Sequence, residues 1–297
     1  MLNEGFTRLK LSDQVIVKPF LEKAQINHSL STFAALLMWD TYEHYWWKVE
    51  DDQLLLIASP EKPFLPLPPR GWGDRKKAIR QCQKLIGWLG TNALKIDCVD
   101  KFERDDLDCI NAYESYHDYI YETQSIIELK GKKYSSRRGS RNSFLKHNSE
   151  VRCLPYDDSQ YNCCRDLLLK WQQQSDPNCT LNIERKRSVE YSCVSRILTE
   201  VDSLDLVGMT VYVDDKLIGF TFGEMLDAET CSVLIEKTDR TYKGSAEFIW
   251  SEFLRRYWNH TRWCNAGDDN GVPSLEWTKN SYHPTSMLTK WKVVCSV

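Results

Sequence analysis

The chain has 297 residues, a formal net charge of -3 and a hydrophobic content of 42%. This length is enough for two domains, and the composition is that of a globular protein. The small net charge excludes a general nucleic-acid binder, so any such contact must come from a local basic patch.

Cysteine use and the lack of targeting signals indicate a soluble protein. The 11 cysteines are scattered without a C-x-x-C motif, which is typical of reduced thiols in a cytosolic protein. The first residues form no apolar signal core, and no apolar run reaches the roughly 18 residues that a membrane span needs. We therefore expect a cytoplasmic location, with peripheral contact with a membrane left open.

The sequence lacks the common signatures of metal sites and of DNA-binding modules. His44, His117 and His283 follow no metal-ligand spacing. No helix-turn-helix or zinc motif occurs. We expect neither a metal ion nor a DNA partner.

The first predicted helix starts at Ser12-Asp13. Its expected apolar face consists of Val15, Ile16, Phe20 and Leu21. A second helix is expected at residues 30–38.

A β-hairpin follows these helices. Its strands, at 45–49 and 54–58, are joined across Asp51-Asp52. After a Pro-rich loop at 60–69, Gly73-Asp74 begins a helix that ends at Gly90, and a strand is expected at 94–98. This order of elements predicts an α/β mixture.

The charge changes sign in the middle of the chain. Residues 97–128 are rich in acidic side chains, which fits a solvated acidic face or a pocket for a cationic amino acid. Residues 130–146 carry basic side chains and no acidic one, with Arg137, Arg138 and Arg141 at helical spacing. This density suits a phosphate-bearing partner such as tRNA, CoA or an anionic lipid head group. A basic surface helix that only balances the acidic segment is the alternative.

The second half repeats the element order of the first. A strand at 151–155, helices starting near Asp157 and Ile183, and a hairpin across Asp214-Asp215 are expected. Two copies of one fold are therefore predicted, with an N-terminal domain at 1–127 and a C-terminal domain at 128–297.

A strand, a polar turn and an amphipathic helix are predicted between Val233 and Tyr257. The turn closes on Gly244 and the helix starts at Ser245. Such a turn directs free N–H groups and the positive end of a helix dipole at whatever lies above it. Glycine also caps many turns that bind nothing, so the motif by itself is a weak signal.

Three segments carry a family resemblance: GKKYSSRRGSRNSFLK at 131–146, IEKTDRTYKGSAEFIWSEF at 235–253 and NAGDDNGVPSLEWTKNSYHP at 265–284. Together they resemble the bacterial family related to the C-terminal synthase domain of phosphatidylglycerol lysyltransferase. The segment FAALLMW at 33–39 resembles the opening helix of that family. The resemblance therefore covers nearly the whole chain.

The resemblance implies a tandem GNAT fold with two mixed-sheet halves and flanking helices. Studied relatives move an aminoacyl group from aminoacyl-tRNA to a lipid hydroxyl or a peptide amine, so an acyltransferase or aminoacyltransferase is the favoured function, with the acceptor open. No cofactor is then required beyond the co-substrate, which is aminoacyl-tRNA or acyl-CoA. A CoA-dependent N-acyltransferase and a non-catalytic ligand-binding protein remain as alternatives.

The chain departs from the family pattern at two places. The phosphate-binding turn of the superfamily starts with Gln or Arg, where this chain has Thr241, which puts CoA binding in doubt. Ala266 and Gly267 stand where the family commonly has Arg and Glu. A changed substrate or a lost reaction would account for this second departure.

Acyl transfer needs a base for the acceptor and donors for the carbonyl oxygen, and needs no covalent enzyme intermediate. Glu236 at the end of the central strand, Asp269 or its neighbour Asp268, and His283 are the candidate bases. Tyr282 is a candidate proton donor, although a core aromatic is the plainer interpretation.

The remaining candidates concern phosphate. Lys243 and the N–H groups of Gly244, Ser245 and Ala246 form the candidate carrier or oxyanion site. Arg137, Arg138 and Arg141 are the candidate tRNA contacts. Asp268 is also a candidate substrate ligand, and Lys279 either meets a phosphate or pairs with Glu276.

Overall fold

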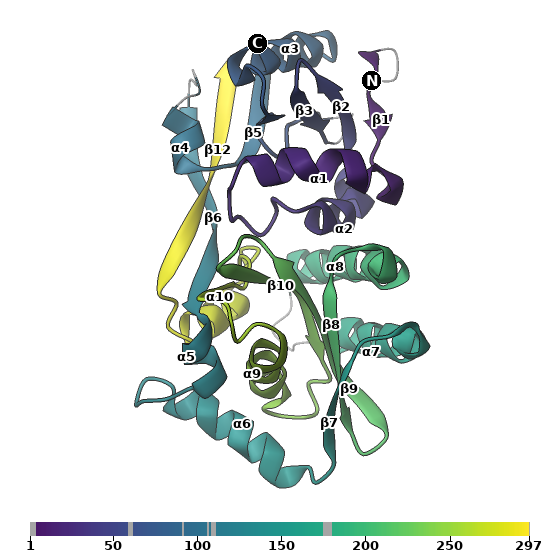
Figure 1. Cartoon of the computed structure of the whole chain (residues 1–297), viewed down its shortest axis with the longest axis vertical. Coiled ribbons are helices and arrows are strands. Elements are labelled where there is room, and N and C mark those ends of the chain that lie inside the picture. Colours follow the sequence, from purple (N-terminus) through teal and green to yellow (C-terminus); the bar gives the residue numbers. More distant parts are fainter. Residues whose placement is uncertain are drawn as a thin grey trace. The chain divides into compact units, whose positions relative to one another are not determined.

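The computed structural model describes residues 4–58, 62–90, 92–105, 107, 111–174 and 180–296, without the side chains of Trp88 and Asp105. Parts of the predicted Pro-rich loop (60 and 61) and acidic segment (106 and 108) lie outside these residues. The chain divides into two units (Figure 1). Unit 1 contains residues 1–118 and 288–297, and unit 2 contains residues 119–287.

The division differs from the predicted boundary at 127/128. Strand β6 (Asn111–Glu122) runs across position 118 without a turn, so the local sequence carries no signal there. The last strand, β12 (Ser286–Ser296), contributes its end to unit 1. The chain therefore passes from one unit to the other twice, after residue 118 and after residue 287, whereas the sequence predicted one boundary.

Unit 1 contains the predicted helices and hairpin. Its strands β1 (Thr7–Arg8), β2 (Trp46–Glu50), β3 (Gln53–Ile57) and β4 (Arg70–Gly71) form an antiparallel sheet, and β5 (Ala93–Val99) pairs antiparallel with β12. Its helices are α1 (Gln14–Lys23), α2 (Phe33–Glu43), α3 (Arg75–Trp88) and α4 (Lys101–Asp105). Asp51 and Asp52 both have positive φ (49° and 56°), as the tight turn of a hairpin requires. The hairpin prediction is confirmed.

The buried face of α1 differs from the predicted one. Val17 and Leu21 are buried, whereas Val15 and Ile16 are 82% and 51% exposed. The apolar residues of this segment are too many for one face of a helix. The face that packs in unit 1 carries Val17 and Leu21, which stand four positions apart. The prediction was therefore wrong for Val15 and Ile16 and right for Leu21.

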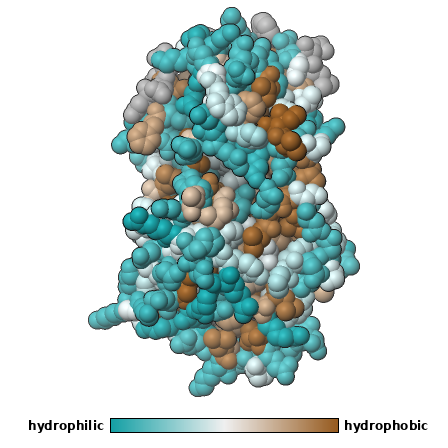
Figure 2. Space-filling view, viewed as in Figure 1, coloured by the Kyte–Doolittle hydropathy of each residue, from teal (hydrophilic) through white to brown (hydrophobic). Residues whose placement is uncertain are grey.

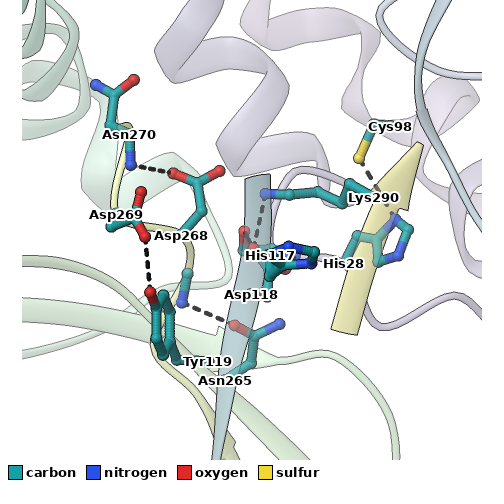
Figure 3. Close-up of polar contacts among 12 residues, drawn as sticks. His28, Cys98, His117, Asp118, Tyr119, Asn265, Asp268, Asp269, Asn270 and Lys290 are labelled. Carbon is teal, nitrogen blue, oxygen red and sulfur yellow. Dashed lines mark hydrogen bonds and ion pairs between the residues drawn. The ribbon is translucent and has the colours of Figure 1, made fainter. Parts of the chain in front are cut away.

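A buried ion pair lies inside unit 1. The Lys290 Nζ donates to Asp118 Oδ1 at 2.7 Å (Figure 3). Asp118 also accepts from the backbone N–H of Ser29 at 2.6 Å. Nearby, the Cys98 Sγ lies 3.4 Å from Nδ1 of His28. Burial lowers the pKa of His28 to about 4 against the opposing effect of Asp118, so this imidazole is neutral at pH 7.

Unit 2 has a mixed sheet in the order β6, β11, β10, β9, β8, β7. The strands are β7 (Val151–Pro155), β8 (Val207–Val213), β9 (Lys216–Met225), β10 (Thr230–Thr238) and β11 (Trp263–Asn265). Only the β10 and β11 pair is parallel among these described neighbours. The helices are α5 (Thr123–Glu128), α6 (Ser135–His147), α7 (Tyr161–Gln173), α8 (Leu181–Glu200), α9 (Ser245–Tyr257) and α10 (Pro273–Asn280).

The two faces of this sheet carry different helices. Figure 1 shows α9 on one side of β8 to β10 and α7 and α8 on the other. Strand alternation directs Lys237 toward α7 and α8, where its Nζ meets Glu190 Oε1 at 2.6 Å. The preceding residue, Glu236, therefore points to the side of α9.

Among the described residues, no helix is both long and apolar enough to cross a membrane.

Candidate functional site

Glu236 lies near the end of β10 on the face that α9 covers. The side chain is half-buried, and burial, supported by the charge of Glu247, raises the pKa of its carboxyl to about 8. The charges of Lys237 and Lys279 oppose this rise. A carboxyl with a pKa close to the working pH can take and return a proton, as a general base must.

Arg137 connects α6 to the start of α9 and to the end of α10. Its Nη1 donates to Glu247 Oε1 at 2.8 Å, and its Nε donates to Ser281 Oγ at 3.0 Å. The guanidinium carbon lies 4.7 Å from the ring centre of Tyr282 and 5.3 Å from that of Trp277. This arginine is therefore held on several sides, and it pairs with Glu247, the acid whose charge acts on Glu236.

The ring of Tyr282, which Arg137 contacts, belongs to a group of three packed aromatic side chains. The rings of Tyr121 and Trp250 are 5.0 Å apart, and those of Trp250 and Tyr282 are 4.6 Å apart, both edge to face. Burial and the charge of Glu247 raise the pKa of Tyr282 well above its usual range, while Arg137 opposes this rise. The phenol therefore remains protonated, and its O–H can donate a hydrogen bond or a proton.

Lys279 stabilises the loop that follows β11. Its Nζ donates to the backbone carbonyls of Ala266 and Gly267, the second at 3.0 Å. The Asp269 carboxylate accepts from the Tyr119 hydroxyl at 2.7 Å (Figure 3) and from the N–H of Gly271 at 2.8 Å. At Ala266 and Gly267, where the family commonly has Arg and Glu, the backbone carbonyls thus accept from a lysine of the same unit.

Asp239 organises the turn before α9. This buried carboxylate accepts from Gln174 Nε2 at 3.0 Å and from Thr241 Oγ1 at 2.7 Å, and it pairs with Lys170. Burial alone would raise the pKa of Asp239, but the hydrogen bonds from Lys170 and Thr241 outweigh it and hold the pKa well below its usual range. Thr241, where the superfamily has Gln or Arg, therefore serves to close this turn.

Helix α6 packs directly on the glycine of the turn. Gly244 has a φ of +87°, and a Cβ built on it would lie 2.2 Å from the backbone oxygen of Ser140. A side chain at this position would be both strained and in collision with backbone. Close packing of α6 and α9 thus suffices to explain the glycine.

We expect the Gly244→Ala substitution to lower the free energy of unfolding by about 2 to 4 kcal/mol, because it adds both backbone strain and overpacking. Gly139→Ala on α6 is the matched control, since a Cβ there meets nothing within 4 Å. It should leave stability unchanged or raise it by up to about 1 kcal/mol. Urea denaturation of both variants measures the difference, and equal values would mean that α6 does not pack on the turn.

Two of the predicted tRNA contacts, Arg138 and Arg141, bond to backbone carbonyls of the same unit. Arg138 donates to the carbonyl of Leu129, and Arg141 donates to that of Ile127 at 3.0 Å, so both cap the end of α5. Lys243 is exposed. His283 is also exposed, with a φ of 54°, and its Nε2 lies 3.0 Å from the carbonyl oxygen of Lys133.

The structure therefore brings some predicted residues together and separates others. Glu236, Tyr282, Lys279 and Arg137 lie in one cluster of unit 2, and Asp269 joins them through Tyr119. His283 and Lys243 lie outside it. The sequence did not predict two members of this cluster, Glu247 and Tyr119. Glu247 had a signal in the sequence, because an acidic residue in the first turn of a helix is favoured by the helix dipole.

No group of three or more His, Cys, Asp or Glu side chains is placed to hold a metal ion in the part of the chain that the structure describes.

Comparison with known proteins gives a family match over most of the chain. The model for "Phosphatidylglycerol lysyltransferase, C-terminal" matches residues 22–294. A curated relative, the uncharacterized protein MYCGA3080 of Mycoplasmoides gallisepticum, is 26% identical over 187 residues, which are 62% of this chain. The match spans 58% of the length of that relative.

Solved structures with a similar fold cover nearly the whole chain. A conserved protein of unknown function from Bacteroides thetaiotaomicron has a TM-score of 0.88 and 26% identity, covering 98% of this chain and 99% of its own. The C-terminal domain assigned to a lysylphosphatidylglycerol synthetase of Agrobacterium fabrum has a TM-score of 0.63 at 12% identity, over 97% and 93% of the two chains. FemX, a tandem GNAT-like protein, has a TM-score of 0.55 at 9% identity, over 98% and 97%. The predicted tandem GNAT fold is confirmed.

Proposed function

The chain belongs to the family of the C-terminal domain of phosphatidylglycerol lysyltransferase, and on this basis we propose that it transfers an aminoacyl group from aminoacyl-tRNA to a lipid acceptor. The observation that carries the proposal is the half-buried Glu236 with a pKa of about 8, set beside Arg137 and Tyr282 in unit 2.

The proposed chemistry is a direct displacement at an ester. The acceptor hydroxyl gives its proton to Glu236 as its oxygen attacks the carbonyl carbon of the aminoacyl ester. The bond between that carbon and the ribose oxygen breaks, and the ribose oxygen takes up the proton that Glu236 accepted, which restores the carboxylate. One ester is replaced by another, so no oxidant and no covalent enzyme intermediate are needed.

Two observations favour tRNA over CoA as the carrier. In the turn before α9, where the superfamily binds CoA, the Thr241 hydroxyl donates a hydrogen bond to Asp239. The backbone of Ser140 in α6 packs directly on the glycine of this turn. Exposed lysines lie in the same basic segment as Arg137, and we propose them as contacts for the tRNA backbone: Lys130, Lys132, Lys133 and Lys146.

The experiment that tests the proposal combines the protein with a mixture of aminoacyl-tRNAs, each with a labelled amino acid, and phosphatidylglycerol vesicles. The expected result is labelled lipid after extraction and a tRNA affinity that falls steeply as salt increases. Acetyl-CoA serves as the competing donor, and its binding should be read as a rise in melting temperature. Absence of tRNA binding at low salt would sink the proposal, and stabilisation by CoA would favour a CoA-dependent N-acyltransferase.

The assay also separates an enzyme from a protein that only binds. Binding of aminoacyl-tRNA without loss of its ester, for every acceptor tried, would favour a non-catalytic role for the same fold. Hydrolysis or transfer that depends on Glu236 would favour the enzyme.

A further inference from the structure

Two cysteines face each other across neighbouring strands in the core of unit 2. Cys231 of β10 is in register with Cys264 of β11, and the two strands are parallel. Side chains in register lie on the same face of a sheet, and both cysteines belong to the core cluster that includes Phe253 of α9. Neighbouring strands are about 4.8 Å apart, and a disulfide joins Cα atoms that are about 4.4 to 6.8 Å apart. The backbone therefore already has the spacing that a disulfide needs.

The two thiols, which are free in the structure, share a hydrogen bond. The S–H of Cys264 donates to the sulfur of Cys231, which lowers the pKa of Cys231 against the effect of burial and raises that of Cys264 well above its usual range. The Thr261 hydroxyl, 3.6 Å from the Cys231 sulfur, lowers the pKa of Cys231 further. In contrast, burial raises the pKa of Cys82 and Cys164 to about 12. Cys231 thus forms a thiolate, the reactive species, more readily than these other buried cysteines.

We propose that Cys231 and Cys264 are a redox-reactive pair, which hydrogen peroxide converts into a disulfide that links β10 to β11. The Cys231 thiolate attacks one oxygen of the peroxide, the O–O bond breaks, and a sulfenic acid forms as the other oxygen leaves and becomes water. The Cys264 sulfur then attacks the sulfenic sulfur, the S–O bond breaks and a second water leaves. Each sulfur loses one electron, both peroxide oxygens are reduced to water, and the two thiol protons end in these waters. The inference goes beyond the proposed function, because it needs neither a donor nor an acceptor of an aminoacyl group.

The burial of the pair limits which oxidants can reach it. Both cysteines are 0% exposed, so neither contributes to the largely hydrophilic surface that Figure 2 shows. Strand β11 has three residues, and three in-register pairs join it to β10. Such a short pairing can open locally while the rest of the fold remains intact. A small oxidant such as hydrogen peroxide can use this opening.

The two strands that the disulfide would link both lead to the candidate site. Strand β10 carries Glu236. Strand β11 leads into Ala266 and Gly267, whose carbonyls accept from Lys279. The link would therefore fix the distance between two strands from which the site is built.

Peptide mapping tests the proposal without tRNA or lipid. The intact protein is purified with a reductant, treated with a molar excess of hydrogen peroxide, alkylated under denaturing conditions and digested with trypsin. Trypsin places Cys231 in peptide 217–237 and Cys264 in peptide 263–279, each as the single cysteine. The expected product is one linked peptide, with the summed mass less two hydrogen atoms, which a reductant separates.

The same oxidation should raise the melting temperature by about 5 °C or more, because the link closes a loop in the unfolded chain. In Cys231→Ala this shift and the linked peptide should both disappear, and Cys264 should remain open to alkylation. Cys164→Ala is the matched control, since Cys164 is also buried in unit 2. It should leave the yield of linked peptide within about twofold of that of the unchanged protein.

Circular dichroism before each assay establishes that every variant is folded, and the peptide map of the unchanged protein decides the question even if a variant does not fold. Three results of that map would overturn the proposal. The first is that both cysteines are alkylated after peroxide treatment as before it. The second is oxidation of Cys231 to a sulfinic acid without a link. The third is a link from Cys231 to a different cysteine, such as the exposed Cys163.

Discussion

Replacing Glu236 by Gln should reduce aminoacyl transfer by about 10²- to 10⁴-fold, which is the usual contribution of a positioned general base. The substitution keeps the shape of the side chain and removes its ability to take a proton. The measurement is the rate of lipid labelling under single-turnover conditions. A loss of less than about threefold would remove Glu236 from the catalytic step.

The pH dependence gives this prediction a second readout. Because the pKa of Glu236 is raised to about 8, the basic form increases with pH, so log kcat/KM should rise below pH 8 and level off above it. Stability should change in the opposite direction: the folded state holds the proton that the unfolded state has lost, so the free energy of unfolding should fall as pH rises from 4.5 to 8. In the Gln variant both dependences should disappear.

Glu229 supplies the matched control for this substitution. It is an exposed acid of unit 2 that precedes β10. Glu229→Gln changes the same charge in the same way, and its transfer rate should stay within about twofold of that of the unchanged protein.

Breaking the buried ion pair of unit 1 should be among the most destabilising changes in the chain. The side chains of Asp118 and Lys290 are 0% and 4% exposed. Asp118→Asn removes the carboxylate that meets the buried ammonium group of Lys290, and Lys290→Met removes the ammonium group that meets the buried carboxylate of Asp118. Each should lower the free energy of unfolding by about 3 to 5 kcal/mol, measured by urea denaturation.

The double variant discriminates a buried charge pair from simple loss of packing. With both charges removed, Asn at position 118 can still accept from the N–H of Ser29, so the loss should be far smaller than the sum of the single losses. Glu22→Gln at the exposed pair of Lys18 and Glu22 is the control, with a loss of at most about 0.5 kcal/mol. Additive losses in the double variant would contradict this account.

Local features of the fold could be predicted because a few residues determine them. The Asp51-Asp52 hairpin, the start of α3 after Asp74 and the glycine turn before α9 each depend on neighbours in sequence. The hydrogen bond from the N–H of Lys77 to Asp74 Oδ1, at 3.1 Å, is such a local cap. In these cases the local pattern leaves few alternatives.

The orientation of a helix face depends on distant contacts, and here the local pattern was insufficient. Helical spacing placed Arg137 and Arg141 on one face, yet Arg137 meets Glu247 and Arg141 meets the carbonyl of Ile127. Long side chains reach different partners from neighbouring positions. In the same way, the contacts of unit 1 bury Val17 where the pattern favoured Val15 and Ile16.

The candidate site was only partly predictable for a related reason. Glu236 was expected from its position at the end of the central strand. Its raised pKa, however, depends on burial and on the charge of Glu247, and burial at one residue is a property of the folded chain. The neighbours come from strands and helices that are far apart in sequence, such as Tyr119 and Tyr282.

The strand that completes unit 1 is synthesised after the whole of unit 2. Residues 119–287 form unit 2 without interruption, whereas unit 1 needs residues 288–297, of which Trp291 and Val293 to Ser296 pair with β5. Domains fold as units while the chain is being made. All residues of unit 2 are therefore synthesised before the last strand of unit 1. A premature stop before residue 288 would remove that strand, so it would damage unit 1, whose first residues were translated before those of unit 2.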